Sequence, residues 1–228
     1  MKNYYAEKLN AVSMVQVYET NIPRIRQYLS AEIEYIIQNL NSSDSVLEFG
    51  AGFGRILKEL APHAAAVAGF DISQESVALG QQYLKGLSNV KLVQADIHQF
   101  ETDQRYDVVL CVQNGLSAMK GDPAHTVEKA VSLVKTGGKA LFSSYSPKFW
   151  AYRLAWFQEQ ADKGLLGQLD FKKSIHGEIV CQDGFTATTH TEEDFLHFAS
   201  ALPYPYEIQE VDRSSVFLVI HKNDTKRI

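Results

Sequence analysis

The stretch VLEFGAGFGR, Val46 to Arg55, places three glycines at every second position behind a glutamate. Glycines at this density disfavour the interior of a helix or strand, because each loses more conformational freedom on folding than any other residue. The residues before them are apolar, and the helical pattern RILKELAP follows, ended by Pro62. The stretch therefore predicts a tight turn between a strand and a helix, where the backbone can lie directly against a ligand.

Strands and helices alternate outward from this turn. Short apolar segments predict strands at 45–50, 64–71, 89–96, 106–112 and 139–145. Helical patterns lie between them at 55–62, 73–86 and 122–135, with Ser73 as an N-cap and the sequence TGG as the stop after the last helix. Strands separated by helices indicate an α/β fold with a parallel, doubly wound sheet.

Two further regions lie outside this alternation. Apolar residues at steps of three and four predict a helix over 22–40, and a weaker pattern predicts another over 4–18. After Tyr145 we expect an aromatic-rich helix at 147–164 and a hairpin at 177–190, with Asp183-Gly184 as its two-residue turn. A helix at 191–201, started by Thr191 and Asp194 in a capping arrangement, and closing strands at 205–211 and 214–222 complete the chain.

The composition is that of an ordinary globular protein. The 228 residues carry a net charge of −5, from 22 basic and 27 acidic residues, and no run of basic residues marks a nucleic-acid-binding face. The two cysteines, Cys111 and Cys181, have no metal-ligand spacing, so we expect no metal site and a reduced, cytoplasmic environment. No segment has the apolar length of a signal core or a membrane span, so we expect no membrane association.

The residues after the strands indicate what the turn binds. Ligands of open parallel sheets bind at the carboxyl ends of the strands. The spacing G-x-G-x-G with Arg55 next differs from the dinucleotide fingerprint G-x-G-x-x-G, and the Glu48 carboxylate would repel a pyrophosphate. A ligand with a cationic amine fits better. S-adenosylmethionine is such a ligand, and Asp71 could accept both of its ribose hydroxyls while Asp96 accepts from its adenine amino group.

With these motifs in order, the sequence resembles the class I S-adenosylmethionine-dependent methyltransferases. The matching segments are LEFGAGFGR, GFDIS, QADIHQF, YDVVLCVQNGLSAM and LVKTGGKALFSSY, which cover about 45–145. The resemblance implies a Rossmann-like sheet of seven strands in the order 3-2-1-4-5-7-6, with only the last strand antiparallel. It also implies that Gly50, Gly52 and Gly54 wrap the methionyl part of the cofactor. The predicted cofactor-binding residues are Glu48, Gly50, Gly52, Gly54, Arg55, Asp71, Ile72, Asp96, Ile97 and Gln113.

On this interpretation the chain is a single domain over 1–228. It has an N-terminal helical cap at 1–42, a cofactor-binding core at 43–145, a lid insertion after the fifth strand at 146–190, and a closing unit at 191–228. The cap and the lid together would roof the methyl-transfer cleft. The predicted acceptor-binding residues are Tyr5, Tyr18, Asn114, Tyr145, Trp150 and Arg153. The motif N-P-P-[YF], found in enzymes that methylate the amino groups of bases, is absent, and CVQNGL stands in its place, so we expect no nucleic-acid partner.

Several of these residues have simpler interpretations. Asp71 and Asp96 are also typical helix caps, and Asn114-Gly115 is an ordinary turn pair. The aromatic residues at 145–157 could form a cage for a cation or merely pack, and Arg153 could bind an anionic acceptor or form a salt bridge. The predicted function is methyl transfer to a small-molecule acceptor by a monomer or homodimer. The alternatives are a non-catalytic protein that binds S-adenosylmethionine and a nicotinamide-dependent oxidoreductase.

Overall fold

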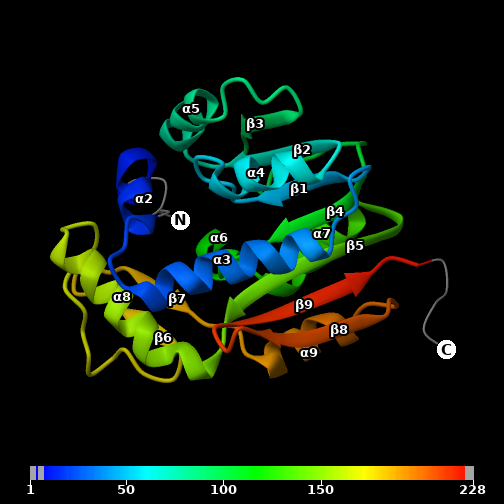
Figure 1. Cartoon of the computed structure of the whole chain (residues 1–228). Helices are drawn as coiled ribbons and strands as arrows, with labels where there is room; N and C mark the ends of the chain where they lie inside the picture. The colour runs from blue at the N-terminus through cyan, green and yellow to red at the C-terminus, as the bar shows by residue number, and fades with distance from the viewer. Residues whose placement is uncertain (1–3, 5–7, 224–228) are drawn as a thin grey trace.

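One mixed sheet organises the molecule (Figure 1). The computed structural model describes Tyr4 and residues 8–223, and the predicted acceptor residue Tyr5 lies outside them. The strands are β1 (Ser45–Phe49), β2 (Ala66–Asp71), β3 (Val90–Gln94), β4 (Tyr106–Cys111), β5 (Val134–Tyr145), β8 (Tyr206–Val211) and β9 (Ser215–His221). They lie in the order β3-β2-β1-β4-β5-β9-β8, and β9 is antiparallel to both neighbours. Counted within this sheet, the order is 3-2-1-4-5-7-6, as expected.

Helices cover both faces of the sheet, as the doubly wound pattern predicts. The helices of the core are α3 (Pro23–Gln38), α4 (Arg55–Leu60), α5 (Gln74–Tyr83), α6 (Gly115–Met119), α7 (Pro123–Ser132) and α9 (Glu192–Ser200). One apolar cluster joins α7 and α9 to one face, through residues such as Val127 and Phe195. A second cluster joins α3, α4 and α5 to the other face, through Ile36, Leu57 and Val77.

The predicted helix caps are present. The Ser73 hydroxyl accepts a hydrogen bond of 3.1 Å from the amide of Ser76, and Thr191 and Asp194 form a capping box at the start of α9. Each cap satisfies amides that a helix N-terminus leaves without a partner. These short-range signals therefore place α5 and α9 correctly. A 3₁₀ turn at Ala61–His63 carries Pro62 and follows α4 directly.

Strand β5 is longer than its apolar pattern indicates. It begins at Val134 rather than at Lys139, because Val134 pairs with Tyr106 and a register shift before Val108 takes up the extra residues. Gly138 suits this irregularity, since an added Cβ would lie 2.4 Å from the carbonyl oxygen of Asp107. The helix predicted over 122–135 consequently ends at Ser132, and TGG lies within the strand.

The N-terminal segment and the insertion form a third apolar cluster. Besides Ile25, Tyr28 and Leu29 of α3, it includes residues of α2 (Ala11–Tyr18), of the 3₁₀ turn Pro147–Phe149, of α8 (Trp150–Asp162) and of the hairpin β6 (Glu178–Val180) and β7 (Thr186–Thr188). Figure 1 shows these elements on the side toward which the parallel strands point. Within the expected range of 4–18, Tyr4 is helical, but a turn at 8–10 precedes α2, so a single continuous helix is not formed.

The hairpin turn differs from its prediction. Three residues, Gln182 to Gly184, separate the hydrogen-bonded pair Cys181 and Phe185, and the Cys181 amide donates to the Phe185 carbonyl at 2.9 Å. Gly184 has φ +92°, which is the left-handed conformation that a three-residue hairpin loop requires at its last position. The Asp183-Gly184 pair is thus part of a longer turn than the two-residue turn expected.

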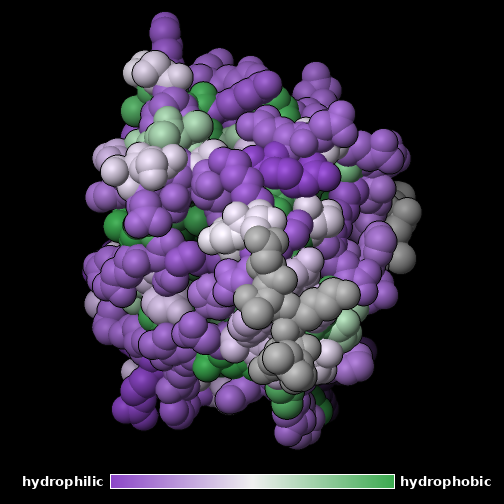
Figure 2. Space-filling view, turned by 90° about the vertical axis from the view of Figure 1, so that its right-hand side faces the viewer, coloured by the Kyte–Doolittle hydropathy of each residue, from purple (hydrophilic) through white to green (hydrophobic). Residues whose placement is uncertain are grey.

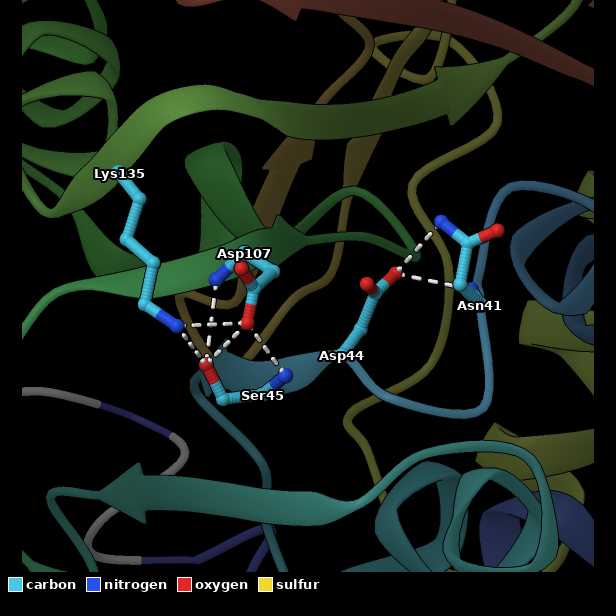
Figure 3. Close-up of polar contacts among 5 residues, drawn as sticks. All are labelled: Asn41, Asp44, Ser45, Asp107 and Lys135. Carbon is cyan, nitrogen blue, oxygen red and sulfur yellow. Dashed lines mark hydrogen bonds and ion pairs between the residues drawn. The ribbon is translucent and has the colours of Figure 1, made fainter.

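At the amino ends of the parallel strands, polar side chains form hydrogen bonds and an ion pair between neighbouring segments (Figure 3). Asp107 near the start of β4 accepts from the Ser45 amide at 2.7 Å and pairs with Lys135 at 2.8 Å. Asp44 accepts from the amide of Asn41 at 2.8 Å in the preceding loop. Figure 2 views the molecule from this side and shows a mainly hydrophilic surface.

Candidate functional site

A cavity of about 360 Å³ lies at the carboxyl ends of the parallel strands. Its walls come from the glycine turn after β1, from the residues that follow β2, β3 and β4, and from α2 and α8. Because the carboxyl ends of parallel strands meet at one edge, residues far apart in the sequence converge there. Of the predicted cofactor-binding residues, all but Gly54 line this cavity.

The glycine turn presents bare backbone to the cavity. Gly50 and Gly52 have φ values of +68° and +56°, which non-glycine residues rarely adopt. The nearest atom to a Cβ added at Gly52 would be Cγ of Met14 at 4.0 Å, so the space beside it is open. A ligand could therefore contact the backbone at Gly52 directly.

Gly54 has a different position from the one that the resemblance implies. It is the residue before α4, with φ +82°, and it does not line the cavity. A Cβ at this position would lie 2.6 Å from Cδ1 of Leu84, just beyond α5. Gly54 thus allows α4 and α5 to pack closely, which is a structural requirement.

An acidic and a basic side chain, Glu48 and Arg55, stand at the two ends of the turn. Glu48 is 4% exposed, and burial raises the pKa of its carboxyl to about 8 although the Arg55 guanidinium opposes the shift. The guanidinium lies over the ring of Tyr18, 4.5 Å from its centre. Within residues 4 and 8–223, Glu48 Oε2 and Arg55 Nε and Nη2 are buried without a hydrogen-bond partner. Such atoms are expected where a polar ligand completes the site.

The two aspartates lie in the cavity wall as expected. Asp71 accepts hydrogen bonds of 2.9 Å from the amides of Gly52 and Ser73, one on each oxygen, and burial raises its pKa. Asp96 accepts from the amide of His98 at 2.9 Å. Each carboxylate oxygen has more than one acceptor position, so both side chains retain capacity for a ligand. Asp71 therefore both holds the glycine turn and faces the cavity, together with Ile72 and Ile97.

The end of β4 is strained and joins the core to the insertion. Gln113 and Asn114 have φ values of +54° and +61°. This backbone conformation costs free energy in residues other than glycine and often occurs at functional sites. Gln113 lines the cavity, and its Nε2 has no partner in the described chain. Asn114 lies behind the wall instead, where it donates to the Thr188 carbonyl at 2.9 Å and accepts from Ser144 at 2.7 Å.

The predicted acceptor-binding residues divide into two groups. Tyr18 and Tyr145 line the cavity, whereas Asn114, Trp150 and Arg153 do not. Burial of the Tyr145 hydroxyl raises its pKa to about 12, although the Arg153 guanidinium opposes the shift.

Arg153 is fully buried, so the surface salt bridge considered from the sequence is wrong, and it does not line the cavity as an anion-binding residue would. Its guanidinium donates to the carbonyl oxygens of Gly177 and Ala187 and to the Thr189 hydroxyl. It also lies 4.4 Å from the ring centre of Tyr145. The cation holds the hairpin against α8 and stands behind the aromatic wall rather than in it.

The cavity is also lined by residues that the sequence did not single out as ligand-binding. They are Leu9, Met14 and Val17 before the core, His98, Met119 and Lys120 around α6, and Gln160 on α8. Trp156 and Phe157 of α8, which belong to the aromatic residues considered for a cage, line it as well. The spacing of Trp156 and Gln160, at i and i+4, places both on one face of α8. Only the tertiary arrangement shows that this face is turned toward the cavity.

Comparisons with known proteins agree with this geometry. Residues 46–138 match the family described as a methyltransferase domain. A ubiquinone biosynthesis O-methyltransferase from Coxiella burnetii (strain Dugway 5J108-111) is 30% identical over 155 residues, 66% of this chain and 65% of that protein. Over its cofactor-binding core the chain is therefore similar to methyltransferases. The match spans less than two thirds of that relative's own length.

Solved structures show the same fold. The structure titled DhpI-SAH complex has a TM-score of 0.65 at 19% identity and covers 92% of each chain. The N-methyltransferase NodS from Bradyrhizobium japonicum WM9, in complex with S-adenosyl-L-homocysteine, has a TM-score of 0.61 at 16% identity and covers 98% of this chain and 100% of its own. At these identities the likeness concerns the fold alone.

The described part of the chain has neither a metal-binding cluster nor a membrane-spanning helix. Within it, no group of three or more His, Cys, Asp or Glu side chains is arranged to hold a metal ion. None of the described helices has the length and apolar character needed to span a bilayer. The two cysteines are buried and free.

Proposed function

We propose that this chain transfers a methyl group from S-adenosylmethionine to a small-molecule acceptor. The observation that carries the proposal is the set of unpartnered polar atoms around an open glycine turn. Glu48 Oε2, Arg55 Nε and Nη2, and Gln113 Nε2 are buried at one end of a ligand-sized cavity, without partners among the described residues. A methionyl group, with one ammonium and one carboxylate, matches a carboxylate and a guanidinium placed in this way.

The residues along the cavity suit the rest of the cofactor. Glu48 would hold the ammonium and Arg55 the carboxylate, with Gly50 and Gly52 giving backbone contact. Asp71 would accept from the ribose hydroxyls, Ile72 and Ile97 would flank the adenine, and Asp96 would accept from its amino group. When bound, S-adenosylmethionine supplies an electrophilic methyl group on its sulfonium.

The contribution of the chain to the reaction is alignment and exclusion of water. Displacement at carbon with a neutral leaving group needs the accepting atom held in line, and such positioning can supply about 7–11 kcal/mol of the barrier reduction. Side chains of α2 and α8 cover the cavity and would keep bulk water away. The name of the Coxiella burnetii relative makes a hydroxyl oxygen the first accepting atom to test.

Two measurements test the proposal. Calorimetry should show binding of S-adenosylmethionine and S-adenosylhomocysteine, and radiolabelled S-adenosylmethionine should yield a methylated product from a panel of small phenols and alcohols. Binding without any product would favour the non-catalytic alternative. Thermal stabilisation by a nicotinamide cofactor, and none by S-adenosylhomocysteine, would favour an oxidoreductase. A cytoplasmic location and a monomeric or homodimeric state remain parts of the proposal, the latter testable by sedimentation.

A further inference from the structure

The wall of the cavity is asymmetric in charge. Every charged or ionisable lining residue other than tyrosine comes from the core, namely Glu48, Arg55, Asp71, Asp96, His98 and Lys120. The wall given by the N-terminal segment and the insertion, which we call the acceptor wall, consists of Leu9, Met14, Val17, Tyr18, Trp156, Phe157 and Gln160. Apart from the tyrosine hydroxyl and the indole N–H, its one polar group is the amide of Gln160.

The Gln160 amide is buried and faces the cavity. Gln160 is 2% exposed and lines the cavity from α8. No hydrogen bond engages its side chain in residues 4 and 8–223, whereas neighbouring Gln158 on the outer side donates to Asp162 at 2.7 Å. Neither amide atom is among the buried, unpartnered polar atoms of the described residues, so the amide lies at the surface of the cavity, where a ligand or water can reach it. Its position therefore indicates a polar group on the molecule that occupies this compartment.

The indole N–H of the acceptor wall is already engaged. The Trp156 indole donates to the Val17 carbonyl at 3.1 Å, so it is not available to a ligand. Arg153 and Arg55 stack on the rings of Tyr145 and Tyr18, at 4.4 and 4.5 Å. Of these two groups only the Arg55 guanidinium lines the cavity, and there it occupies a ring face of Tyr18 that a cationic acceptor would need.

We infer that Gln160 determines acceptor specificity: its amide hydrogen-bonds an oxygen substituent on a neutral, ring-shaped acceptor held between the aromatic side chains of the acceptor wall. An anionic acceptor would face no cation on this wall, because the guanidinium of Arg153 is committed to carbonyl oxygens of the hairpin. This inference rests on the proposed function, since it assumes that the cofactor occupies the charged end.

Three phenols of similar size serve as probes. They are 4-hydroxyacetophenone, which is neutral and carries a carbonyl, 4-ethylphenol, which lacks it, and 4-hydroxybenzoate, which is anionic at pH 7. Binding is measured by calorimetry with and without saturating S-adenosylhomocysteine. In the wild type, 4-hydroxyacetophenone should bind about five- to tenfold more tightly than 4-ethylphenol, as expected for one hydrogen bond. The benzoate should bind most weakly.

Variants of Gln160 distinguish the effect of its amide on probe binding from the effect of its size. Gln160→Leu should abolish the difference between 4-hydroxyacetophenone and 4-ethylphenol while leaving S-adenosylhomocysteine affinity unchanged. Gln160→Glu, which keeps the size but loses the donor, should weaken binding of the ketone by a similar factor. The control Gln158→Leu lies on the same helix and should retain the wild-type preference. Thermal melts confirm that each variant is folded.

The outcomes are distinct for the two proposals. If S-adenosylhomocysteine does not bind, the proposed function fails, and the ranking of the probes without it still tests the amide. Equal weakening of all three probes in Gln160→Leu, tightest binding of 4-hydroxybenzoate, or no binding of any probe would overturn the role of Gln160.

Discussion

The indole of Trp156 donates a hydrogen bond of 3.1 Å to the carbonyl oxygen of Val17 and so joins α8 of the insertion to α2 of the N-terminal segment. Two further contacts reinforce this joint. The Thr20 hydroxyl donates to Glu159 at 2.6 Å, and Lys163 donates to the Gln16 carbonyl at 3.3 Å. Neither segment alone encloses the cavity, because both contribute to its wall.

We expect deletion of residues 1–18 to reduce methyl transfer at least tenfold while the sheet still folds. The deletion removes four cavity residues, Leu9, Met14, Val17 and Tyr18, and admits water to the reaction site. The two clusters that pack against the sheet contain no residue from this segment. Circular dichroism would check the fold and a labelled-cofactor assay the rate. A folded truncation that retains the full rate would show that the roof is unnecessary.

Replacement of Asp71 by alanine should weaken binding of S-adenosylmethionine by about ten- to a hundredfold. Hydrogen bonds to a charged acceptor contribute about 1.5–3 kcal/mol, which corresponds to that range. The variant also loses two contacts that hold the glycine turn, with the amides of Gly52 and Ser73. Asp103→Ala, at an exposed loop position, is the matched control for loss of one charge. Wild-type affinity in Asp71→Ala would leave this residue only its capping role.

The sequence was sufficient to predict the sheet and the core side of the cavity. Alternating apolar and helical patterns locate the strands, and parallel strands bring the residues after β1, β2 and β3 to one edge. Asp71 and Asp96 therefore follow from their place after a strand. The position of Gly54 outside the cavity wall could not be predicted, because a glycine motif does not show which of its members faces the cavity and which faces a neighbouring helix, here near Leu84.

The acceptor side of the cavity could not be predicted in the same way. The sequence suggested an anion-binding or a surface role for Arg153, yet carbonyl groups of the hairpin surround its guanidinium. No local pattern reveals which backbone oxygens will meet a side chain across 24 or 34 positions in the chain. The sequence contains no feature that marks Gln160 as a ligand-binding residue, because glutamine is common on the solvent-exposed face of an amphipathic helix.

A side chain at Gly52 should abolish cofactor binding more completely than it destabilises the fold. Gly52→Val introduces a Cβ at φ +56° and fills the open space beside the turn. Gly137→Val is the matched control, since Gly137 has φ +86° with no atom within 4 Å of an added Cβ. Both variants should lose about 1–2 kcal/mol of unfolding free energy through backbone strain. Only Gly52→Val should lose affinity in calorimetry, and equal affinity in both variants would contradict the proposed contact.

Cofactor binding should release a proton from Glu48. The pKa of about 8 means that the carboxyl is protonated at pH 6.5 in the free protein, while pairing with an ammonium requires the carboxylate. Calorimetry at pH 6.5 in buffers of different ionisation enthalpy should therefore report release of about one proton. Glu48→Gln should bind more weakly and release none. Identical proton release in the two proteins would assign the ionisation to another group.

Asp107 should stabilise the fold at neutral pH and lose this effect in acid. Burial alone would raise the pKa of its carboxyl, but Lys135 and Ser45 donate to it at 2.8 and 2.6 Å and together lower the pKa from 3.8 to about 2. Its stabilising contribution is therefore present above pH 3.8 and is lost as pH falls toward 2. Asp107→Asn should lower the unfolding free energy by about 1–2 kcal/mol at pH 7, since the side chain is partly exposed.

The measurement compares urea unfolding of Asp107→Asn and the wild type at pH 7 and near pH 2. The difference between them should shrink at the lower pH, because protonation removes from the wild type the charge that the variant already lacks. Asp103→Asn removes a charge from an exposed loop position and should unfold like the wild type at pH 7. A difference of the same size at both pH values would mean that Asp107 acts through packing at the strand edge rather than through its charge.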